Sequence, residues 1–546
     1  MKLYNNQNKI ITYKHNNEEI NIPEYIYKDE DIRGCWIASV SNMDIPICQD
    51  IKEYQNYLIS ILENMKSYNM NTAIFHIRPC NDAFYSSKLN PWSKYITGIE
   101  GKDPGFDVFD FFIREAKKRN IKVHAWLNPY RVSKEKLNEI GLTKDEYLDT
   151  LADNNFAKVH REHTIVDGAS KIILRPGHKE VVDFLIETVK EIVENYDIEA
   201  IHMDDFFYPY DPISNDDELE DYLKYRVNEY QTMKEWRISN VDTLIQKIHQ
   251  TLKEIYICTG KKVEFGISPF PIYRTHSSIL ETGWEKGSYN SKGCFQCYDG
   301  QYSDIYKWMK EGWIDYVVPQ DYFSFSRTDA SYHDICWWWS NICKETNTKL
   351  YMGQAIYHLG ETNTKYGDTW QNVNEIHNQI AFNCNFDNIK GVIFFRYSSL
   401  VKGDNEILNQ GLDILKKDWK KRHNVVAGII KKDNKIFCCQ RGPKKDCAYK
   451  WEFPGGKIEK GETHEQALVR EIKEELGCLV KVNELITVVK HEYENYFVTL
   501  NVYACEVTEG TPKNLEHIDF KWCEKERLKE LDFVEADYQF LDLLMK

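Results

Sequence analysis

Three glutamates near the C-terminal end of the chain have the spacing of a metal site. Glu471, Glu474 and Glu475 stand at i, i+3 and i+4, so on a helix they share one face and can contact the same ion. Carboxylates this close repel one another and raise each other's pKa unless a cation lies among them. Oxygen ligands of this kind favour Mg²⁺ or Mn²⁺ over Zn²⁺. The spacing therefore predicts a divalent metal site, and a solvated acidic helix face is the alternative.

The residues before these glutamates predict how their helix begins. Thr463 and Gln466 have the spacing of a capping box, which predicts a helix that starts after Thr463. Arg470 lies on that helix, and we expect it to pair with Glu462 in the preceding loop. Such a pair would hold the loop against the helix.

The full spacing over residues 456–477, Gly-x5-Glu-x7-Arg-Glu-Ile-x-Glu-Glu-x-Gly, resembles the Nudix box at every fixed position. The run at 450–459 resembles the MutT-type branch, whose members act on nucleoside triphosphates. The resemblance extends from Val425 to about Leu544. It implies a Mg²⁺-dependent hydrolase of nucleoside diphosphate-X compounds, in which water attacks a phosphorus activated by metal. The implied metal ligands are Glu471, Glu474 and Glu475.

The same resemblance implies further site residues. Gly455, Gly456 and Lys457 are expected to contact the substrate, because glycines let the backbone approach phosphate oxygens closely. Glu516 resembles a family acid that supplies a metal ligand or the general base. Asp537 occupies the position at which members of this branch recognise the nucleobase of the substrate. Members that act on oxidised guanine often carry Asn there, so cytosine-type and other substrates stay open, and a helix N-cap is the alternative role of Asp537.

The elements upstream predict an α/β fold. Eight β-rich apolar runs, most separated by helix-like stretches, recur at residues 33–40, 72–78, 122–128, 200–205, 263–269, 316–320, 350–356 and 391–397. Strand and helix repeated eight times predict a (β/α)8 TIM barrel. Several runs end in polar and aromatic clusters, where barrels of this type place their active sites. Shorter strands, a Gly-Gly loop and a helix follow and predict a smaller α+β domain.

These patterns predict four segments along the chain. Residues 1–30 are an N-terminal extension, and residues 31–415 form the barrel. The basic, polar stretch at 416–423 is expected to be a linker, and residues 424–546 form the α+β unit.

The clusters at 33–44, 78–86, 124–131, 201–209 and 311–320 resemble the glycosyl-hydrolase-like family 10, the DUF187 group. The resemblance runs over nearly all of residues 31–410. It implies a TIM barrel that acts on polysaccharide, with peptidoglycan glycan strands as the best-supported substrate class. Glycoside hydrolysis needs two carboxyl groups that face each other across the scissile bond. Asp204 and Asp205, at the end of the fourth strand, match an Asp-Asp pair of the family.

Adjacent strand residues point to opposite faces, so only one aspartate faces the barrel mouth unless the strand breaks there. The partner acid is therefore open, and the candidates are Asp44, Asp82 and Asp321. Four further polar residues are expected to contact sugar hydroxyls or, alternatively, to form hydrogen bonds inside the barrel: His124, Asn128, His202 and Gln320.

Composition restricts the partners and the compartment. The 546 residues carry a net charge of −15, so neither a duplex nucleic acid nor a membrane surface is an expected partner. No apolar run is long enough to span a bilayer, and the Asn- and Lys-rich N-terminus is not expected to be an export signal. Fifteen scattered Cys then predict reduced thiols and a cytoplasmic protein. The expected partners are a nucleotide and a glycan. Two alternatives to catalysis stay open: a barrel that only binds glycan or acts as a sensor, and a C-terminal unit that senses a nucleotide. The oligomeric state is open.

Overall fold

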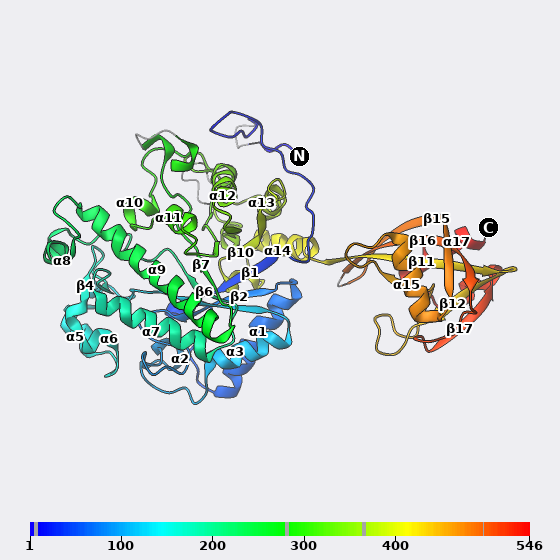
Figure 1. Cartoon of the computed structure of the whole chain (residues 1–546), viewed down its shortest axis with the longest axis horizontal. Helices are drawn as coiled ribbons and strands as arrows, with labels where there is room; N and C mark the ends of the chain where they lie inside the picture. Colours follow the sequence, from blue (N-terminus) through cyan, green and yellow to red (C-terminus); the bar gives the residue numbers. More distant parts are fainter. Residues whose placement is uncertain (5–8, 279–282, 363–366, 368, 495, 546) are drawn as a thin grey trace. The chain divides into compact units, whose positions relative to one another are not determined.

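The computed structural model describes residues 1–4, 9–278, 283–362, 367, 369–494 and 496–545. The chain divides into two compact units, Met1–Asp418 and Trp419–Lys546 (Figure 1).

The first unit is built on a closed barrel of eight parallel strands. Around the barrel the strands follow the order β1-β10-β9-β8-β7-β6-β3-β2, with β2 and β1 adjacent. Each predicted apolar run overlaps one of them, so the predicted TIM barrel is confirmed. The strands are β1 (Ile32–Ile37), β2 (Thr72–Arg78), β3 (Lys122–Leu127), β6 (Ala200–Met203), β7 (Glu264–Ile267), β8 (Tyr316–Val317), β9 (Lys349–Gln354) and β10 (Ile389–Phe394).

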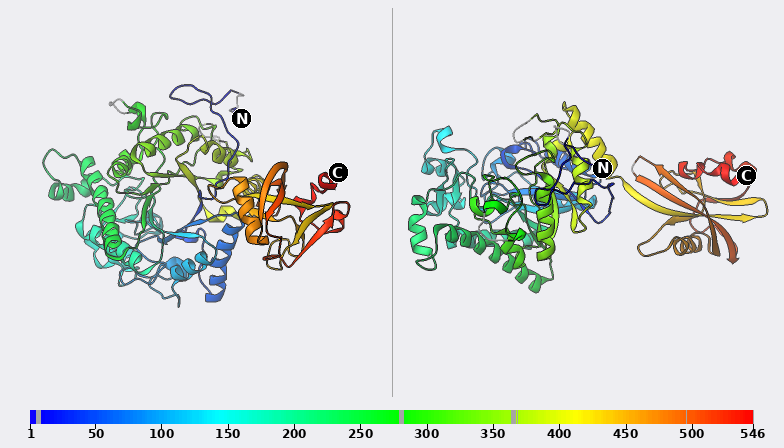
Figure 2. Two further views of the ribbon diagram at one scale, coloured as in Figure 1. Left: turned by 45° about the vertical axis from the view of Figure 1, so that its right-hand side comes forward. Right: turned by 90° about the horizontal axis from the view of Figure 1, so that it is seen from above.

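Helices lie between the strands and surround the barrel (Figure 2). The main ones are α1 (Ile51–Ser67), α3 (Val108–Lys118), α7 (Lys179–Asn195), α9 (Met233–Thr259), α11 (Ile305–Lys310), α12 (Tyr332–Thr346), α13 (Glu375–Asn383) and α14 (Glu406–Asp418). The buried residues of α7, such as Val181, Leu185 and Ile192, recur at helical spacing and form the face that packs inward. Within the described residues, no helix is long and apolar enough to cross a membrane.

The loops between the barrel strands contain short helices and strands. The connection from β3 to β6 is the longest of these and holds a two-stranded antiparallel sheet of β4 and β5. The short elements before α9 are η1 (Val40–Asn42), α2 (Lys94–Thr97), α4 (Leu137–Ile140), α5 (Lys144–Asp149), α6 (Phe156–Val159), η2 (Arg161–His163), β4 (Thr164–Val166), β5 (Ile172–Leu174), η3 (Asp216–Glu218) and α8 (Leu219–Tyr225). Further along the chain lie α10 (Cys297–Gly300), η6 (Ile356–His358) and η8 (Tyr397–Leu400).

The barrel interior is filled by a polar-aromatic network around Tyr316. The indole of Trp36 can only donate, so it donates to Nε2 of His202 at 3.2 Å. Nδ1–H of His202 then donates to the Tyr316 hydroxyl at 3.1 Å, and that hydroxyl donates to Nδ1 of His124 at 2.8 Å. A Cβ at Gly266 would lie 1.8 Å from the Tyr316 ring, so only glycine leaves room for this ring.

The N-terminal extension packs on the barrel unit. Ile20 and Ile22 are buried. The backbone N–H of Lys14 donates to Asp334 on α12 at 2.9 Å, and Asn385 donates to the carbonyl of Asn21 at 3.0 Å. Residues 5–8 of the extension lie outside the described residues.

The second unit is a mixed sheet of seven strands with helices on both faces. The main path is β13-β12-β11-β16-β15, while β14 pairs with β11 and β17 pairs with β12. The strands are β11 (Lys421–Lys432), β12 (Lys435–Gln440), β13 (Trp451–Glu452), β14 (Gly455–Lys457), β15 (Leu479–Glu492), β16 (Tyr496–Glu509) and β17 (Asp519–Glu524). The helices are α15 (His464–Leu476), η9 (Lys525–Glu530), α16 (Glu535–Tyr538) and α17 (Leu541–Met545).

Alternation along β11 gives this unit two hydrophobic cores. Val426 and Ile430 pack in the core that contains the apolar face of α15. Ala427 and Ile429 pack in the core that contains residues of α16 and α17. Successive strand residues point to opposite faces, so one strand anchors helices on both sides of the sheet.

The segment 416–423, which the sequence predicts as a linker, has mostly regular structure. Helix α14 continues to Asp418, and β11 begins at Lys421, which pairs in register with Tyr496. Only Trp419 and Lys420 therefore lie between the two elements. The segment is polar because one side of each element is exposed.

The second unit should fold without the first. A fragment of residues 419–546 retains both of its cores, so it should unfold in a single cooperative thermal transition measured by circular dichroism. A fragment that begins at Gly428 is the control, because it loses the part of β11 that pairs with β14. This shorter fragment should show no cooperative transition. A featureless melt of the 419–546 fragment would contradict the prediction.

Candidate functional sites

Helix α15 begins and ends as its sequence predicts. The Thr463 hydroxyl accepts the N–H of Gln466 at 3.2 Å, and the Gln466 side chain accepts the N–H of Thr463 at 2.9 Å. This is the predicted capping box. The helix ends at Gly477, whose left-handed conformation (φ 63°) suits glycine. Local sequence therefore fixes the orientation of the glutamates on this helix.

The Arg470 guanidinium joins the helix to the preceding loop. Its Nε and Nη2 donate to the two carboxylate oxygens of Glu462 at 2.8 and 2.9 Å, a bidentate pair. Nη2 also donates to the carbonyl of Lys457 at 3.0 Å, and Nη1 donates to Glu471 at 2.8 Å. The predicted pairing of Arg470 with Glu462 is confirmed.

A cavity of about 380 Å³ lies beside α15 and is lined by several acidic side chains. Glu471 and Glu475 line it together with Glu452 and Glu516. Glu474 does not line it, because its side chain is 59% exposed and reaches Arg470 at 3.4 Å. The structure thus brings together two of the three glutamates that the sequence predicts as metal ligands.

Glu475 is a buried acid of this cavity. Its side chain is only 6% exposed, and Oε2 accepts the N–H of Gly455 at 3.1 Å. Burial, and then the neighbouring charges of Glu452 and Glu516, raise the pKa of Glu475 to about 8. A carboxyl in these surroundings favours either a proton or a bound cation.

Sequence reasoning missed the polar groups opposite α15. Glu452 pairs with Arg441 and also contacts Nε2 of His517 at 3.1 Å. Glu516, which the sequence did predict, pairs with Lys445, and this lysine lowers the pKa of Glu516. These residues come from different strands and loops, and no local spacing marks them as neighbours.

The two glycines before α15 lie in a strand and leave room for a carboxylate. Gly455, Gly456 and Lys457 form strand β14, which pairs with β11, rather than a free loop. A Cβ at Gly456 would lie 2.3 Å from the carboxyl carbon of Glu471. Gly456 therefore leaves the room that the Glu471 carboxylate occupies. Gly455, Gly456 and Lys457 all line the cavity, as a substrate-contacting segment must.

Asp537 also lines this cavity. It lies inside α16 rather than at its N-cap, which is Val534, so the alternative N-cap role is wrong. Its Oδ2 accepts the N–H of Phe453 at 2.9 Å. Burial raises the pKa of Asp537 to about 8, so at neutral pH the group is mainly a neutral carboxyl that can both donate and accept.

The donor set of the cavity fits a hard divalent cation. Glu471 and Glu475 supply carboxylate oxygens, and the almost fully buried Glu475 carboxylate receives one hydrogen bond from the described residues. Oxygen-only sites of this kind suit Mg²⁺ and Mn²⁺.

The barrel has a second candidate site where β6 ends. Strand β6 stops at Met203, so Asp204 and Asp205 lie just beyond it, and both line one cavity of about 200 Å³. The break in the strand removes the restriction that only one of two adjacent residues faces the mouth. Both aspartates are less than one-tenth exposed.

Asp204 is held by three donors. Its Oδ2 accepts the indole N–H of Trp126 at 3.1 Å and the amide of Asn128 at 2.6 Å, and its Oδ1 accepts the N–H of Phe206 at 2.9 Å. Burial, and then the charge of Asp205, raise the pKa of Asp204 to about 6. The carboxyl can therefore exchange a proton near neutral pH.

Asp205 has a different set of partners. Its Oδ2 accepts hydrogen bonds from the Tyr210 hydroxyl and from the amide of Gln301, the latter at 3.1 Å. The two adjacent acids thus occupy distinct environments, which is the usual arrangement for an acid and a base that act together.

The other predicted sugar-contacting residues divide into two groups. Gln320 lines the cavity, and Asn128 supports Asp204. His124 and His202 belong to the Tyr316 network inside the barrel and do not line the cavity. Burial lowers the pKa of His124 to about 3 and lowers that of His202 well below its ordinary value, so both rings are neutral.

None of the three candidate partner acids lines this cavity. Asp44 accepts the backbone N–H groups of Ala38 at 2.7 Å and Ser398 at 2.9 Å. Asp82 accepts the N–H of Cys80 at 2.8 Å, and Asp321 is fully buried. Among the residues that line the cavity, Asp204 and Asp205 are the two acids.

Sequence reasoning did not select the two cations of the barrel cavity, Arg131 and Lys134. The Arg131 guanidinium lies 4.3 Å from the centre of the Phe206 ring. Aromatic side chains complete the lining, and flat rings of this kind stack on sugar faces; they are Trp36, Trp126, Tyr322 and Phe395.

Both regions match known families. Residues 31–372 match the family described as Glycosyl hydrolase-like 10, and residues 421–544 match the NUDIX domain. The chain is 36% identical to glycosyl hydrolase YngK of Bacillus subtilis (strain 168), over 68% of this chain and 69% of that protein. It is 33% identical to glycosyl hydrolase DigH of Escherichia coli (strain K12), over 71% of this chain and 88% of that protein. The C-terminal unit is 37% identical to the CTP pyrophosphohydrolase of Escherichia coli (strain K12), over 22% of this chain and 90% of that protein.

The contact between Gly456 and Glu471 gives a testable expectation. In Gly456→Ala the new methyl group must displace the Glu471 carboxylate, so Mn²⁺ binding measured by electron paramagnetic resonance should weaken. Stability should fall by about 1–3 kcal/mol, the usual cost of overpacking. Gly442→Ala is the matched control, because the nearest atom to its new Cβ is 3.8 Å away. Equal Mn²⁺ affinity in the two variants would show that the contact between Gly456 and Glu471 does not affect metal binding.

Proposed function

Because the chain belongs to the glycosyl hydrolase-like 10 family and carries a NUDIX domain, we propose that it is a two-domain hydrolase. The C-terminal unit hydrolyses a nucleoside triphosphate or another nucleoside diphosphate-X compound. The barrel cleaves a glycan. Both reactions are assigned to the cytoplasm, where nucleotides are available.

The observation that carries the nucleotide reaction is the buried Glu475 carboxyl beside Glu471 in one cavity. These two residues would hold Mg²⁺ or Mn²⁺, and Glu474 would join them by turning away from Arg470. When bound, such an ion withdraws charge from the phosphate oxygens and favours attack by water on phosphorus. Glu516, opposite α15, supplies a further ligand or the general base. The backbone of Gly455 to Lys457 lines the same cavity and would contact the phosphates.

The lining of this cavity also favours one kind of nucleobase in the substrate. Asp537 is a buried, mainly neutral carboxyl, which offers one O–H donor beside an acceptor oxygen. Cytosine presents an amino donor next to a ring-nitrogen acceptor, so the two edges are complementary. The rings of Tyr493 and Tyr496 line the same cavity and provide flat faces for a base. A cytosine nucleotide is accordingly the first substrate to test, and an oxidised or non-standard dNTP is the second.

In the barrel, Asp204 is the candidate general acid and Asp205 the candidate base or nucleophile. The raised pKa of Asp204 keeps part of it protonated near neutral pH, as an acid that protonates a leaving group must be. The aromatic lining of the cavity suits sugar rings. Peptidoglycan-type glycan strands are the first substrate class to test, and a nucleotide-linked sugar is the second.

One observation favours a non-catalytic barrel that binds a glycan and regulates the NUDIX unit. Asp204 accepts three hydrogen bonds and Asp205 two, all from the protein. Carboxyls satisfied in this way also occur as purely structural pairs. Binding of glycan strands without cleavage would favour this second function.

Removal of the Glu475 charge should stop nucleotide hydrolysis. Glu475→Gln keeps the shape of the side chain but not its charge, so kcat for CTP hydrolysis in Mg²⁺ should fall about 10²-fold or more. Glu465→Gln, which changes an exposed glutamate on the same helix, is the matched control and should keep full activity. Pyrophosphate release measures both. Full activity of Glu475→Gln, or of the wild type in excess EDTA, would contradict metal-dependent hydrolysis and favour a sensor.

Glycan cleavage by the barrel should depend on Asp204 and on pH. Since the acid must be protonated, kcat/KM should fall as pH rises through about 6, the raised pKa of Asp204. Asp204→Asn should lose about 10²-fold or more of the activity, the usual contribution of a general acid. Asp82→Asn, which keeps the oxygen that accepts the Cys80 N–H, should cleave normally. Release of reducing ends measures each variant, and an Asp204→Asn enzyme as active as the wild type would exclude this acid.

A further inference from the structure

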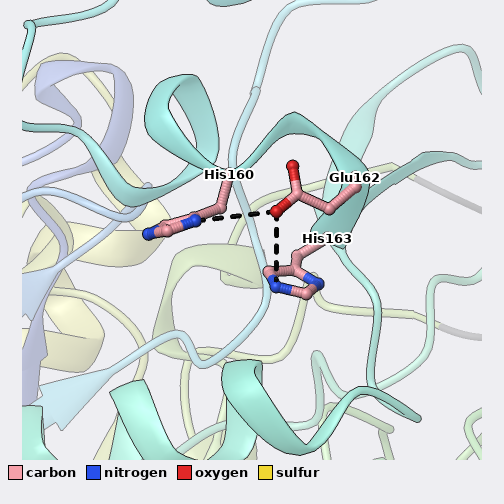
Figure 3. Close-up of side chains that lie close together, drawn as sticks. All are labelled: His160, Glu162 and His163. Atoms are coloured by element: carbon pink, nitrogen blue, oxygen red, sulfur yellow. Dashed lines mark ion pairs between the residues drawn. The ribbon is translucent and has the colours of Figure 1, made fainter.

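A cluster of three side chains that can bind metal, two histidines and one glutamate, lies between α6 and β4, outside both cavities described above. His160, Glu162 and His163 surround one point on this turn (Figure 3). Nδ1 of His160 and Nε2 of His163 each lie 3.6 Å from the same oxygen, Oε1 of Glu162. The three atoms lie within 4.8 Å of one another.

These distances suit ligands around an ion better than direct pairing. At 3.6 Å, each imidazole lies beyond hydrogen-bond distance of the carboxylate, and it forms an ion pair with it only when protonated. Ligand atoms at the corners of a tetrahedron around Zn²⁺, with bonds of about 2.1 Å, are about 3.4 Å apart. The two spacings to Oε1 of Glu162 are close to that value.

A hydrogen-bonded relay behind His163 fixes the tautomer that a metal ligand needs. Nε2 of His178 lies 3.0 Å from Oδ1 of Asp221, which only accepts, so this nitrogen carries a proton. Nδ1 of His178 lies 2.8 Å from Nδ1 of His163 and can accept its proton. The lone pair of His163 is then on Nε2, the atom that faces Glu162. Metal-bound histidines usually donate their other N–H to such a partner.

The backbone around the cluster is held in place. The N–H of His163 donates to the carbonyl of His160 at 2.9 Å, which closes the η2 turn, and the N–H of Arg175 donates to the carbonyl of His163 at 2.8 Å. The Arg175 side chain donates to the second oxygen of Asp221 at 2.6 Å. Elements η2, β5 and α8 are thus connected behind the cluster, while Glu162 is 65% exposed on its open side.

We propose that His160, Glu162 and His163 bind a divalent ion of the zinc class. The ligands are Nδ1 of His160, Oε1 of Glu162 and Nε2 of His163, with water at the fourth position, since three protein ligands leave one position open. Two imidazoles separate this site chemically from the NUDIX cavity, whose ligands are carboxylates and which suits Mg²⁺. His178 is a positioning residue that orients His163.

The test uses the full chain without an affinity tag, in excess Mg²⁺ to occupy the NUDIX cavity, and titrates it with ZnCl₂ in a calorimeter. The wild type should bind one Zn²⁺ per chain. His163→Ala should lose this binding, and Glu162→Gln, a change on the exposed side, should weaken it at least about 10-fold. His249→Ala, a histidine of α9 away from the cluster, is the matched control and should bind normally.

The relay is tested by two substitutions of His178. His178→Ala should weaken Zn²⁺ binding about 10- to 100-fold, as the loss of an outer hydrogen-bond partner usually does. His178→Gln keeps an amide oxygen that can accept the His163 proton, so it should recover part of the affinity. Thermal melts of the metal-free variants identify any that fail to fold. If a histidine variant fails to fold, the Zn²⁺ affinity of Glu162→Gln decides whether the cluster binds the ion.

X-ray absorption of the zinc-loaded protein identifies the ligands. Nitrogen and oxygen scatterers at about 2.0–2.1 Å, with the signature of two imidazoles, are expected. Sulfur scatterers at about 2.3 Å would place the ion on cysteines and overturn the proposal. Absence of stoichiometric binding, or equal affinity in the wild type and Glu162→Gln, would overturn it as well.

Discussion

The cost of taking a carboxylate out of water governs both candidate sites. A buried charge is tolerated only where donors, cations or a proton compensate for the lost hydration. Asp204, Glu475 and Asp537 are all nearly buried, and burial is the largest cause of the raised pKa in each. Each unit of the chain therefore needs specific neighbours for its acids, and much of the local architecture supplies them.

The two units meet this requirement in different ways. In the barrel, the end of β6 lets the chain turn so that indole, amide and backbone donors surround Asp204. In the NUDIX domain, the Glu475 carboxyl accepts one backbone N–H and lies among other acids, so a proton or a cation has to compensate for its charge. The barrel acids thus have their hydrogen-bond donors within the protein, whereas the acids beside α15 favour a proton or an ion from solution.

Local signals made most of the fold and part of the sites predictable. The barrel strands are apolar runs with polar ends, and the capping box and the Arg470–Glu462 pair involve residues close in sequence. The pairing of Glu452 with His517 was not predictable, because strand pairing brings together residues that are 65 positions apart. That Asp204 and Asp205 line one cavity was not predictable either, because it depends on where β6 ends, which no residue spacing reveals.

The short connection between α14 and β11 has a consequence for the cell. With Trp419 and Lys420 as the only residues between them, there is no long exposed segment of the kind that proteases prefer to cut. The two units are then made in a fixed one-to-one stoichiometry. Because one chain carries both units, their relative amounts cannot be adjusted by separate synthesis.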